Sequence, residues 1–227
     1  MKNTAIISLG GSVIVPDKIN VDFLKSFKNL ISHKINKGKR FFIITGGGNT
    51  CRLYIKGAKE ISGISRDDLD WLGIHSTVLN AHLLRTIFRK DAYKRIINDP
   101  RDMKDKFKEK IIIASGWSPG WSTDYIAAKI AEKYGIKKII NISNINYVYD
   151  KDPKKFKNAR PLDKICWKNF RKIVGNKWDP GLNMPFDPIA SKLAQKNQMK
   201  INIINGKNIE NLEKCIDDKP FKGTIIY

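Results

Sequence analysis

The stretch Ala5-Ile6-Ile7-Ser8-Leu9-Gly10-Gly11-Ser12 sets the expectation for the fold. Its apolar part has the length of a buried strand, and the two glycines that follow allow the backbone to turn tightly into a helix. A strand that ends in a glycine loop and opens a helix presents unpaired backbone N–H groups, which bind phosphate. The stretch therefore predicts an α/β protein with a phosphate-binding loop after its first strand.

Two further segments repeat the order of apolar run, glycine loop and helix. Gly46-Gly47-Gly48 follows the apolar run at residues 41–44, and Pro119-Gly120-Trp121-Ser122-Thr123-Asp124 follows the run at residues 111–114. Three loops of this kind predict contacts with more than one phosphate group.

The remaining apolar pattern predicts a parallel sheet with helices on both faces. Strands are expected at residues 5–9, 41–44, 93–97, 111–114, 138–142, 201–204 and 224–226. Helices are expected at residues 21–36, about 50–61 with Asn49 or Thr50 as the cap, 66–88, 122–134 and 187–197. In the third helix, the spacing of Leu72, Leu79, Leu83 and Ile87 predicts the buried stripe, and the acids Asp67, Asp68 and Asp70 are expected in the first turn.

Two segments lack this periodicity. Residues 144–161 contain Asp150, Asp152-Pro153 and Pro161, which predict a surface loop, and residues 175–185 are a second candidate for a mobile flap. Trp71 and Trp167 are expected to be packing residues because large aromatic side chains usually bury most of their area.

Length and composition limit the class of protein. The chain has 227 residues, of which 41% are hydrophobic, and this is enough for one α/β domain. We expect no membrane span, because the apolar runs are only strand-sized, and a cytoplasmic location, because no signal peptide is recognisable. The three cysteines follow no metal-binding or disulfide pattern and are expected to be reduced.

The formal charge of +21 raises the alternative of a nucleic-acid-binding protein. The lysines are spread along the chain, however, and form no block of five or six like charges, so a solvated lysine-rich surface is favoured. A nucleic-acid partner is not expected.

A longer set of landmarks carries a resemblance to a known family. These landmarks are residues 8–13, Gly46 to Gly48 followed by Arg52, residues 70–74 with Asn80-Ala81, residues 119–124, residues 143–149 with Asp152-Pro153, residues 186–190 and Gly223-Thr224. In this order and spacing the chain resembles the archaeal type of uridylate kinase, within the amino acid kinase family. The resemblance covers nearly the whole chain.

The resemblance implies a three-layer α/β/α sandwich with a mainly parallel central sheet. It implies transfer of the γ-phosphoryl group of ATP to UMP with Mg²⁺, in pyrimidine nucleotide biosynthesis. Residues 1–227 would form a single amino acid kinase domain, with an acceptor-binding lobe at about 1–135 and an ATP-binding lobe at about 136–227. The family also implies a homo-oligomer, usually a hexamer.

The resemblance also assigns residues, with no dedicated set of protein ligands for the metal. The catalytic residues are Arg52, Asp124 and Asp187. The ATP-binding residues are Gly10, Gly11, Ser12, Gly48, Ser143, Asn144, Tyr149 and Asp152. The UMP-binding residues are Gly46, Gly47, Asp70, Pro119, Gly120, Ser122, Thr123 and Asp124.

Structural roles remain open for several of these side chains. Asp124 and Asp187 stand at expected helix starts, where an acid can serve as a cap alone. Asp70 can be a partner of the helix dipole, Arg52 an exposed helix residue, and Tyr149 a packing residue.

Three departures from the family pattern affect the expected function. Ser8 stands where many amino acid kinases have a lysine, although archaeal uridylate kinases often lack it. Asn146-Tyr147 replaces a common Asp-Gly pair on the ATP side, and Trp121 replaces a smaller residue or a histidine on the acceptor side. The alternatives are therefore a kinase for another small phosphorylated acceptor, and a non-catalytic nucleotide-binding protein similar to the molybdenum storage proteins.

Overall fold

The structure is a computed structural model that describes residues 3–177 and 184–227. Its main sheet has the strand order β3-β2-β1-β4-β8-β9-β7. The strands are β1 (Thr4–Leu9), β2 (Arg40–Thr45), β3 (Ile111–Ala114), β4 (Lys138–Ser143), β7 (Lys164–Ile165), β8 (Lys200–Asn205) and β9 (Thr224–Ile226). Pairing is parallel except between β8 and β9. The expected mainly parallel sheet is confirmed.

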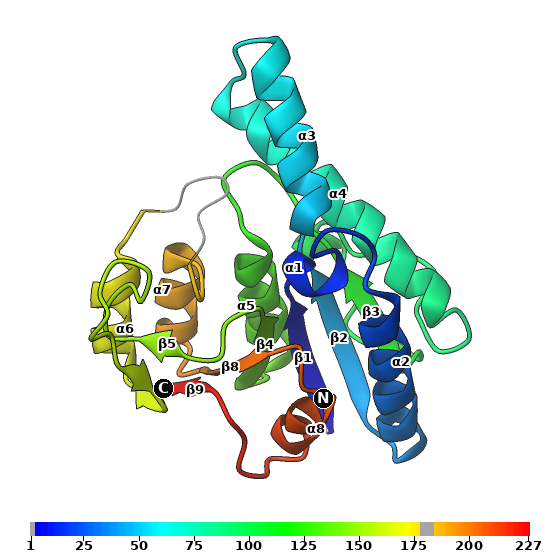
Figure 1. Ribbon diagram of the computed structural model, residues 1–227. Helices are drawn as coiled ribbons and strands as arrows, with labels where there is room; N and C mark the ends of the chain where they lie inside the picture. Colours follow the sequence, from blue (N-terminus) through cyan, green and yellow to red (C-terminus); the bar gives the residue numbers. More distant parts are fainter. Residues whose placement is uncertain (1–2, 178–183) are drawn as a thin grey trace.

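Helices cover both faces of this sheet (Figure 1). The helices are α1 (Gly11–Ile14), α2 (Val21–Asn36), α3 (Gly48–Ile61), α4 (Arg66–Ile87), α5 (Thr123–Tyr134), α6 (Trp167–Val174), α7 (Pro188–Lys196) and α8 (Ile209–Ile216), with the short 3₁₀ helix η1 (Pro100–Asp102). One core lies between the sheet and α1, α2, α4 and α8, and the other between the sheet and α5, α6 and α7. The alternation of strand side chains between the two cores produces the three layers.

Strand β1 lies at the switch point of the sheet. The chain passes from β1 outward to β2 and β3, and then returns to place β4 on the other side of β1. In open parallel sheets, ligands bind in the crevice beyond the carboxyl ends of the strands at such a point. The three glycine-containing loops follow β1, β2 and β3, at the carboxyl ends of these strands.

Local capping explains where several helices begin and end. Asn20 caps α2 by accepting a hydrogen bond from the N–H of Phe23, and Ser122 caps α5 by accepting one from Tyr125. Helix α5 ends at Gly135, which has a positive φ of 64° that glycine adopts without strain. Asp187 caps α7, with Pro188 as the first helical residue.

Helix α4 differs most from expectation. Its buried residues are small or polar ones together with two aliphatic ones, namely Ile74, Ser76, Thr77, Asn80, Ala81 and Leu84. The predicted stripe is therefore wrong, and Leu79 is 60% exposed. The small side chains allow close packing, and Thr45 donates from its hydroxyl to the carbonyl of Thr77. Trp71, expected to be buried, is 45% exposed, whereas Trp167 is buried as predicted.

Three other expectations need correction. The expected strand at residues 93–97 is replaced by two isolated bridges to β3, one from Ile97 and one from Ala92 just before this segment, and the charged pair Lys94-Arg95 between them is exposed. Helix α3 begins at Gly48, within the glycine loop, with no side-chain cap from Asn49 or Thr50. The expected loop at residues 144–161 contains β5 (Val148–Tyr149), which pairs with β6 (Pro161–Leu162). The candidate flap at residues 175–185 falls largely outside the described residues.

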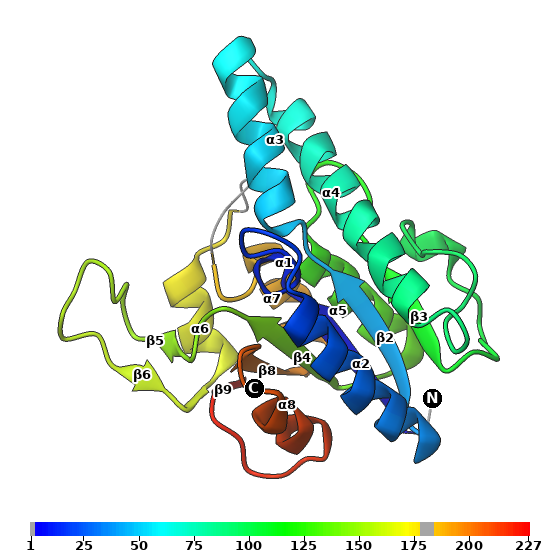
Figure 2. The same ribbon diagram turned by 45° about the vertical axis from the view of Figure 1, so that its right-hand side comes forward.

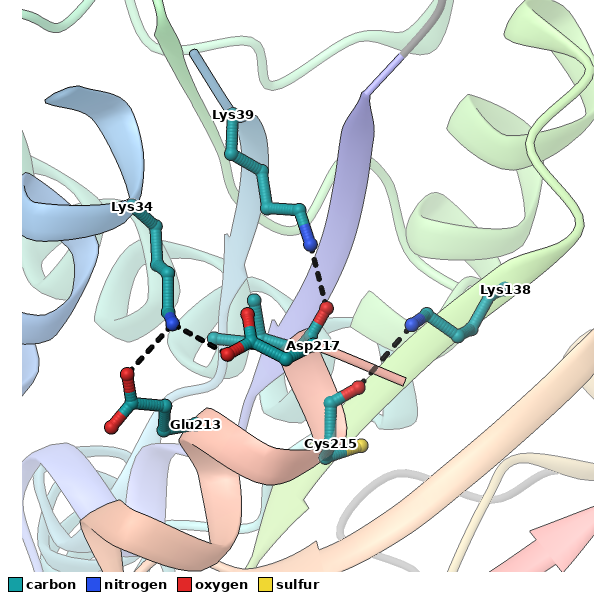
Figure 3. Close-up of polar contacts among 7 residues, drawn as sticks. Lys34, Lys39, Lys138, Glu213, Cys215 and Asp217 are labelled. Atoms are coloured by element: carbon teal, nitrogen blue, oxygen red, sulfur yellow. Dashed lines mark hydrogen bonds and ion pairs between the residues drawn. The ribbon is translucent and has the colours of Figure 1, made fainter. Parts of the chain in front are cut away.

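Helix α8 is joined to α2 by an ion cluster around the buried Lys34 (Figure 3). The ammonium group of Lys34, nearly buried, lies 2.7 Å from carboxylate oxygens of both Glu213 and Asp217. Burial works against the charge of Lys34, but the two acids outweigh it and raise the lysine's pKa. The last helix is thereby tied to the first long one.

Candidate active site

The first two glycine loops meet backbone to backbone at the carboxyl ends of β1 and β2. A Cβ atom on Gly11 would overlap the backbone nitrogen of Gly48, and one on Gly46 would overlap the nitrogen of Gly11. Gly48 also has a positive φ of 67°. Only glycine fits where the two loops approach so closely. The remaining polar groups of both loops therefore lie around one shared space.

Asn80 supports the second glycine loop from below. Its side-chain amide on α4 donates hydrogen bonds of 2.7 Å to the carbonyl of Gly46 and 3.2 Å to that of Gly47. Asn80 was a family landmark in the sequence but received no predicted role. Asn80 stands with Ser76 and Thr77 on the buried face of α4, and this group of small and polar residues at helical spacing is the signal that indicates such a support.

A cavity of about 770 Å³ opens in front of these loops. It brings together predicted residues from both sides of the site, namely Ser12, Gly47, Gly48, Arg52, Asp70, Ser122, Thr123 and Asn144. It also includes Trp121 and Lys207, and Lys207 was not predicted. Lys207 follows β8 and supplies a second cation beside Arg52, which suits a cavity that receives phosphate groups.

Arg52 reaches across the cavity mouth from α3. Its guanidinium donates to the hydroxyl of Ser12 at 3.3 Å and to the carbonyl of Pro16 at 3.2 Å. Both acceptors are neutral and exposed, so these bonds stabilise the side chain weakly. A guanidinium held in this way remains available to anionic oxygens, for which its fork of donors is suited.

Asp70 lines the acceptor side and holds the loop before α5. Its Oδ2 accepts a hydrogen bond of 2.8 Å from the N–H of Gly120. Burial raises the pKa of Asp70, and this hydrogen bond opposes that rise. Asp70 is the fifth residue of α4, and the acids of its first turn are Asp67 and Asp68. A hydrogen bond between α4 and the loop before α5, and not the helix dipole, therefore accounts for its position.

Asp124 and Asp187 meet beneath the cavity. The carboxylate of Asp124 accepts hydrogen bonds from the hydroxyl of Ser8, from the amide of Asn141, and from the backbone N–H of Asp187, at 3.0 to 3.2 Å. Burial, together with the charge of Asp187, raises the pKa of Asp124 to about 7. Ser8, which replaces the lysine of other family members, is thus a partner of this carboxylate.

Asp187 has a free carboxylate oxygen in addition to its role as a cap. Its Oδ1 accepts a bond of 2.6 Å from the N–H of Ala190. Burial raises its pKa, an effect that the Ser122 hydroxyl and amide groups at the start of α7 oppose. Among the described residues, Oδ2 is buried with no hydrogen-bond partner. Capping alone leaves this oxygen unexplained.

The predicted ATP-side residues separate into two groups. Ser143 and Asn144 line a second cavity of about 380 Å³, which adjoins the first through Ser12 and Lys207. Tyr149 and Asp152 line neither cavity. Tyr149 lies in the β5–β6 ribbon, and the carboxylate of Asp152 accepts a local bond from the N–H of Lys154.

The substituted pair Asn146-Tyr147 causes no backbone strain. Among the described residues other than glycine, positive φ angles occur at Asn3, Gln198 and Asp218 only. The side chain of Asn146 accepts a 2.8 Å hydrogen bond from the amide of Asn205 at the end of β8. Loss of the glycine is therefore tolerated, and the asparagine joins the loops after β4 and β8.

Trp121 belongs to an aromatic stack on the acceptor side. Its ring lies 4.2 Å from that of Tyr125 and 6.1 Å from that of Trp117, between centroids. The guanidinium of Arg101 covers Trp117 at 5.2 Å. Because Trp121 also lines the larger cavity, the stack gives that cavity a rigid flat wall.

Two features are absent from the described residues. The ranges 3–177 and 184–227 hold no cluster of three or more histidine, cysteine or acidic side chains placed to bind a metal ion. No helix within them combines the length and apolarity needed to cross a bilayer.

Comparisons with known proteins agree with this geometry. The model of the amino acid kinase family matches residues 3–205. The chain is 33% identical to the uridylate kinase of Thermoplasma volcanium over all of this chain and 98% of that protein, and 34% identical to that of Staphylothermus marinus over the full length of both. The crystal structure of uridylate kinase from Archaeoglobus fulgidus matches with a TM-score of 0.81 at 29% identity, covering 98% of this chain and 99% of that one. UMP kinase from Ureaplasma parvum, 22% identical, has the same fold with a TM-score of 0.78 and coverage of 100% and 99%. The chain belongs to the amino acid kinase family.

Proposed function

We propose that the protein is a UMP kinase that transfers the γ-phosphoryl group of ATP to UMP, giving UDP and ADP for pyrimidine nucleotide biosynthesis. The observation that carries the proposal is the larger cavity, into which both glycine loops, Arg52, Asp70 and the start of α5 converge. The full-length similarity to archaeal uridylate kinases supports the same reaction.

The proposal divides the chain between the two substrates. Residues of about 1–135 would bind UMP, with the ribose at Asp70, the phosphate at Gly46, Gly47 and the start of α5, and the base against the Trp121 stack. Residues of about 136–227, with the loop after β1, would bind ATP. The position of the second cavity beside Ser143 and Asn144 supports this division.

Phosphoryl transfer in this site needs no side-chain base. The acceptor oxygen of UMP belongs to a phosphate that is already anionic at neutral pH, so positioning and charge neutralisation supply the catalysis. Arg52 would hold equatorial oxygens of the transferred group, and Lys207 would add positive charge from the ATP side. The backbone N–H groups of the glycine loops would bind oxygens of the donor and acceptor phosphates and hold the two groups in line for transfer.

The carboxylates beneath the cavity fit a Mg²⁺ ion that arrives with ATP. The buried, unbonded Oδ2 of Asp187 and the neighbouring Asp124 offer the oxygen ligands that Mg²⁺ prefers, directly or through water. A bound Mg²⁺ would neutralise charge on the phosphate oxygens. Asp124 would stay oriented by Ser8 and Asn141.

We further propose a homo-oligomer, hexameric as the family resemblance implies, in the cytoplasm. Exposed apolar side chains on α3 and α4 support association, and three free cysteines suit a reducing compartment.

The test is ADP release from Mg²⁺-ATP by the purified protein with UMP, CMP, dUMP, isopentenyl phosphate or acetylglutamate as acceptor. We expect turnover with UMP, reduced by roughly 100-fold or more in Asp187→Asn, the size of loss typical for one electrostatic group in an active site. Asparagine is also a good helix cap, so this variant should remain folded.

Asp105→Asn is the matched control, because it removes an equal charge from an exposed side chain remote from the cavity. Turnover with another acceptor but not with UMP would show that the proposed acceptor is wrong and would identify the acceptor that the protein uses. Binding of ATP with no turnover on any acceptor would instead identify a non-catalytic nucleotide-binding protein.

A further inference from the structure

A second large pocket lies at the edge of the sheet opposite the active site. Its volume is about 740 Å³, and it shares no residue with the two cavities described above. It begins where β4 and β8 begin, at Lys138 and Lys200, whereas the active site lies where these strands end. We call it the lysine pocket, after four of its lining residues, Lys138, Lys164, Lys200 and Lys219.

The register of the sheet places three of these lysines on one face. Lys138 of β4 pairs with Lys200 of β8. Ile225 of β9 pairs with Asn202 of β8 on one side and with Lys164 of β7 on the other. Since Lys200 and Asn202 are two residues apart on one strand, all of these side chains point to the same side. Lys219 reaches this side from the segment between α8 and β9.

The acids near the pocket do not balance this charge. Asp218 pairs with Lys138 at 2.5 Å, while Glu213 and Asp217 are both occupied by Lys34 (Figure 3). In the described part of the chain, no salt bridge joins an acid to Lys164, Lys200 or Lys219, although Asp163 also lines the pocket and the charge of Lys219 helps to lower the pKa of Asp217. Like charges at paired strand positions destabilise a sheet. A bound anion would remove that repulsion.

Lys39 shows that positive charge acts on this region. Its ammonium donates to the carbonyl of Ile216 at 2.6 Å. Burial and the charge of Lys138 lower the pKa of Lys39. Lys39 and Lys138 thus repel each other, and the neighbouring acids Asp217 and Asp218 offset part of that repulsion.

The rest of the pocket wall combines an amide with flat apolar groups. Asn202, buried in β8, donates only to the thiol of Cys215, at 3.3 Å. Phe221 and the half-exposed Tyr227 also line the pocket. Such a wall suits an organic group attached to the anion.

We propose that the lysine pocket binds a small ligand that carries two or more phosphate groups, separately from the active site. Flexible lysine side chains bind phosphate as point charges, and several of them around one pocket favour a compact polyanion over a single phosphate. The pocket volume lies within the range of small-molecule sites.

The first experiment maps lysine protection in the full-length protein. Lysines are acetylated lightly with and without tripolyphosphate, ATP or a short single-stranded RNA, and the modified positions are measured by mass spectrometry. We expect tripolyphosphate to protect Lys164, Lys200 and Lys219. Lys207 reports separately on binding in the active-site cavity. Stronger protection by ATP than by tripolyphosphate would show that the apolar wall contributes to binding.

The second experiment measures tripolyphosphate binding by calorimetry in Lys164→Glu/Lys200→Glu. Both side chains are exposed and make no side-chain bond within the described residues, so the fold should persist. We expect affinity at this site to fall by roughly tenfold or more, because two charged contacts are reversed. The matched control is Lys90→Glu/Lys94→Glu, which makes the same charge change near the β3 edge.

Three results would overturn the proposal. The first is protection of Lys207 without protection of the pocket lysines. The second is an equal loss of binding in the control variant, which would indicate a general effect of net charge. The third is protection by RNA alone, which would assign the surface to nucleic acid.

Discussion

At the scale of single residues, the carboxyl group of Asp124 couples the active site to the pH dependence of stability. Its pKa is about 7 in the folded protein, against 3.8 as the ordinary value. Between these values the folded state binds more protons than the unfolded state, so the free energy of unfolding decreases as pH rises. Asp124→Asn removes this effect. The quantity to compare is the free energy of unfolding of Asp124→Asn minus that of the unmodified protein. We expect this difference to be larger at about pH 8 than at about pH 5, by roughly 2–4 kcal/mol.

Calorimetric melting of both proteins over that pH range, without nucleotide, measures the difference. The depressed pKa values of Glu213 and Asp217 affect both proteins alike and therefore cancel. Two stability curves that run parallel across the range would show that Asp124 titrates normally.

The guanidinium of Arg52 provides a second test at this scale. Arg52→Lys keeps the charge but loses the planar fork that can hold two phosphate oxygens together. We expect kcat/KM for ATP and UMP to fall by roughly 10- to 100-fold, with a melting temperature close to that of the unmodified protein because the side chain is exposed. Steady-state kinetics and thermal melting curves, measured for both Arg52→Lys and the unmodified protein, test this prediction. Unchanged kinetic constants would show that Arg52 is an ordinary surface residue with no part in catalysis.

At the scale of elements, the contact between the two glycine loops is sensitive to a single methyl group. Gly11→Ala drives a Cβ into the backbone of Gly48, so one loop must move. We expect loss of turnover and destabilisation by roughly 3 kcal/mol or more. Gly57→Ala on α3 is the control, since a Cβ there meets nothing within 4 Å. It should stabilise the protein by roughly 0.5–1 kcal/mol. Thermal unfolding of both variants tests the contrast, and equal effects would refute it.

The elements also show what sequence reasoning can predict. Helix α2 was predicted with its observed bounds, because its apolar stripe and the cap at Asn20 are both local signals. The buried face of α4 was predicted wrongly, because small and polar residues there pack against loops that are distant in sequence. The loops around the cavity were predicted from their glycines. Asn80 and Lys207 were missed, because their contacts depend on how the strands are ordered.

At the scale of the whole molecule, α3 and the start of α4 project from the sheet (Figure 2). Leu53, Tyr54 and Ile61 on α3 are exposed by 58 to 87%, and no residue of α3 is buried. We expect this arm to be an interface between copies of the chain. Leu53→Asp/Ile61→Asp should lower the molar mass measured by light scattering after gel filtration.

Ile19→Asp/Phe156→Asp is the control for that experiment, since it places the same charges at exposed apolar positions away from the arm. A monomeric unmodified protein, or an equal loss of mass in the control, would contradict an interface at α3 and α4.

The ion cluster between α2 and α8 has a consequence for the order in which the chain is made. Lys34 is translated well before its partners Glu213 and Asp217, which follow it by 179 and 183 residues. The central strand β1 likewise acquires its second neighbour only when β4 has been synthesised. A nascent chain can therefore form β1, β2 and α2 while Lys34 still faces water. Burial of that lysine is completed only after α8 has been synthesised and has packed against α2.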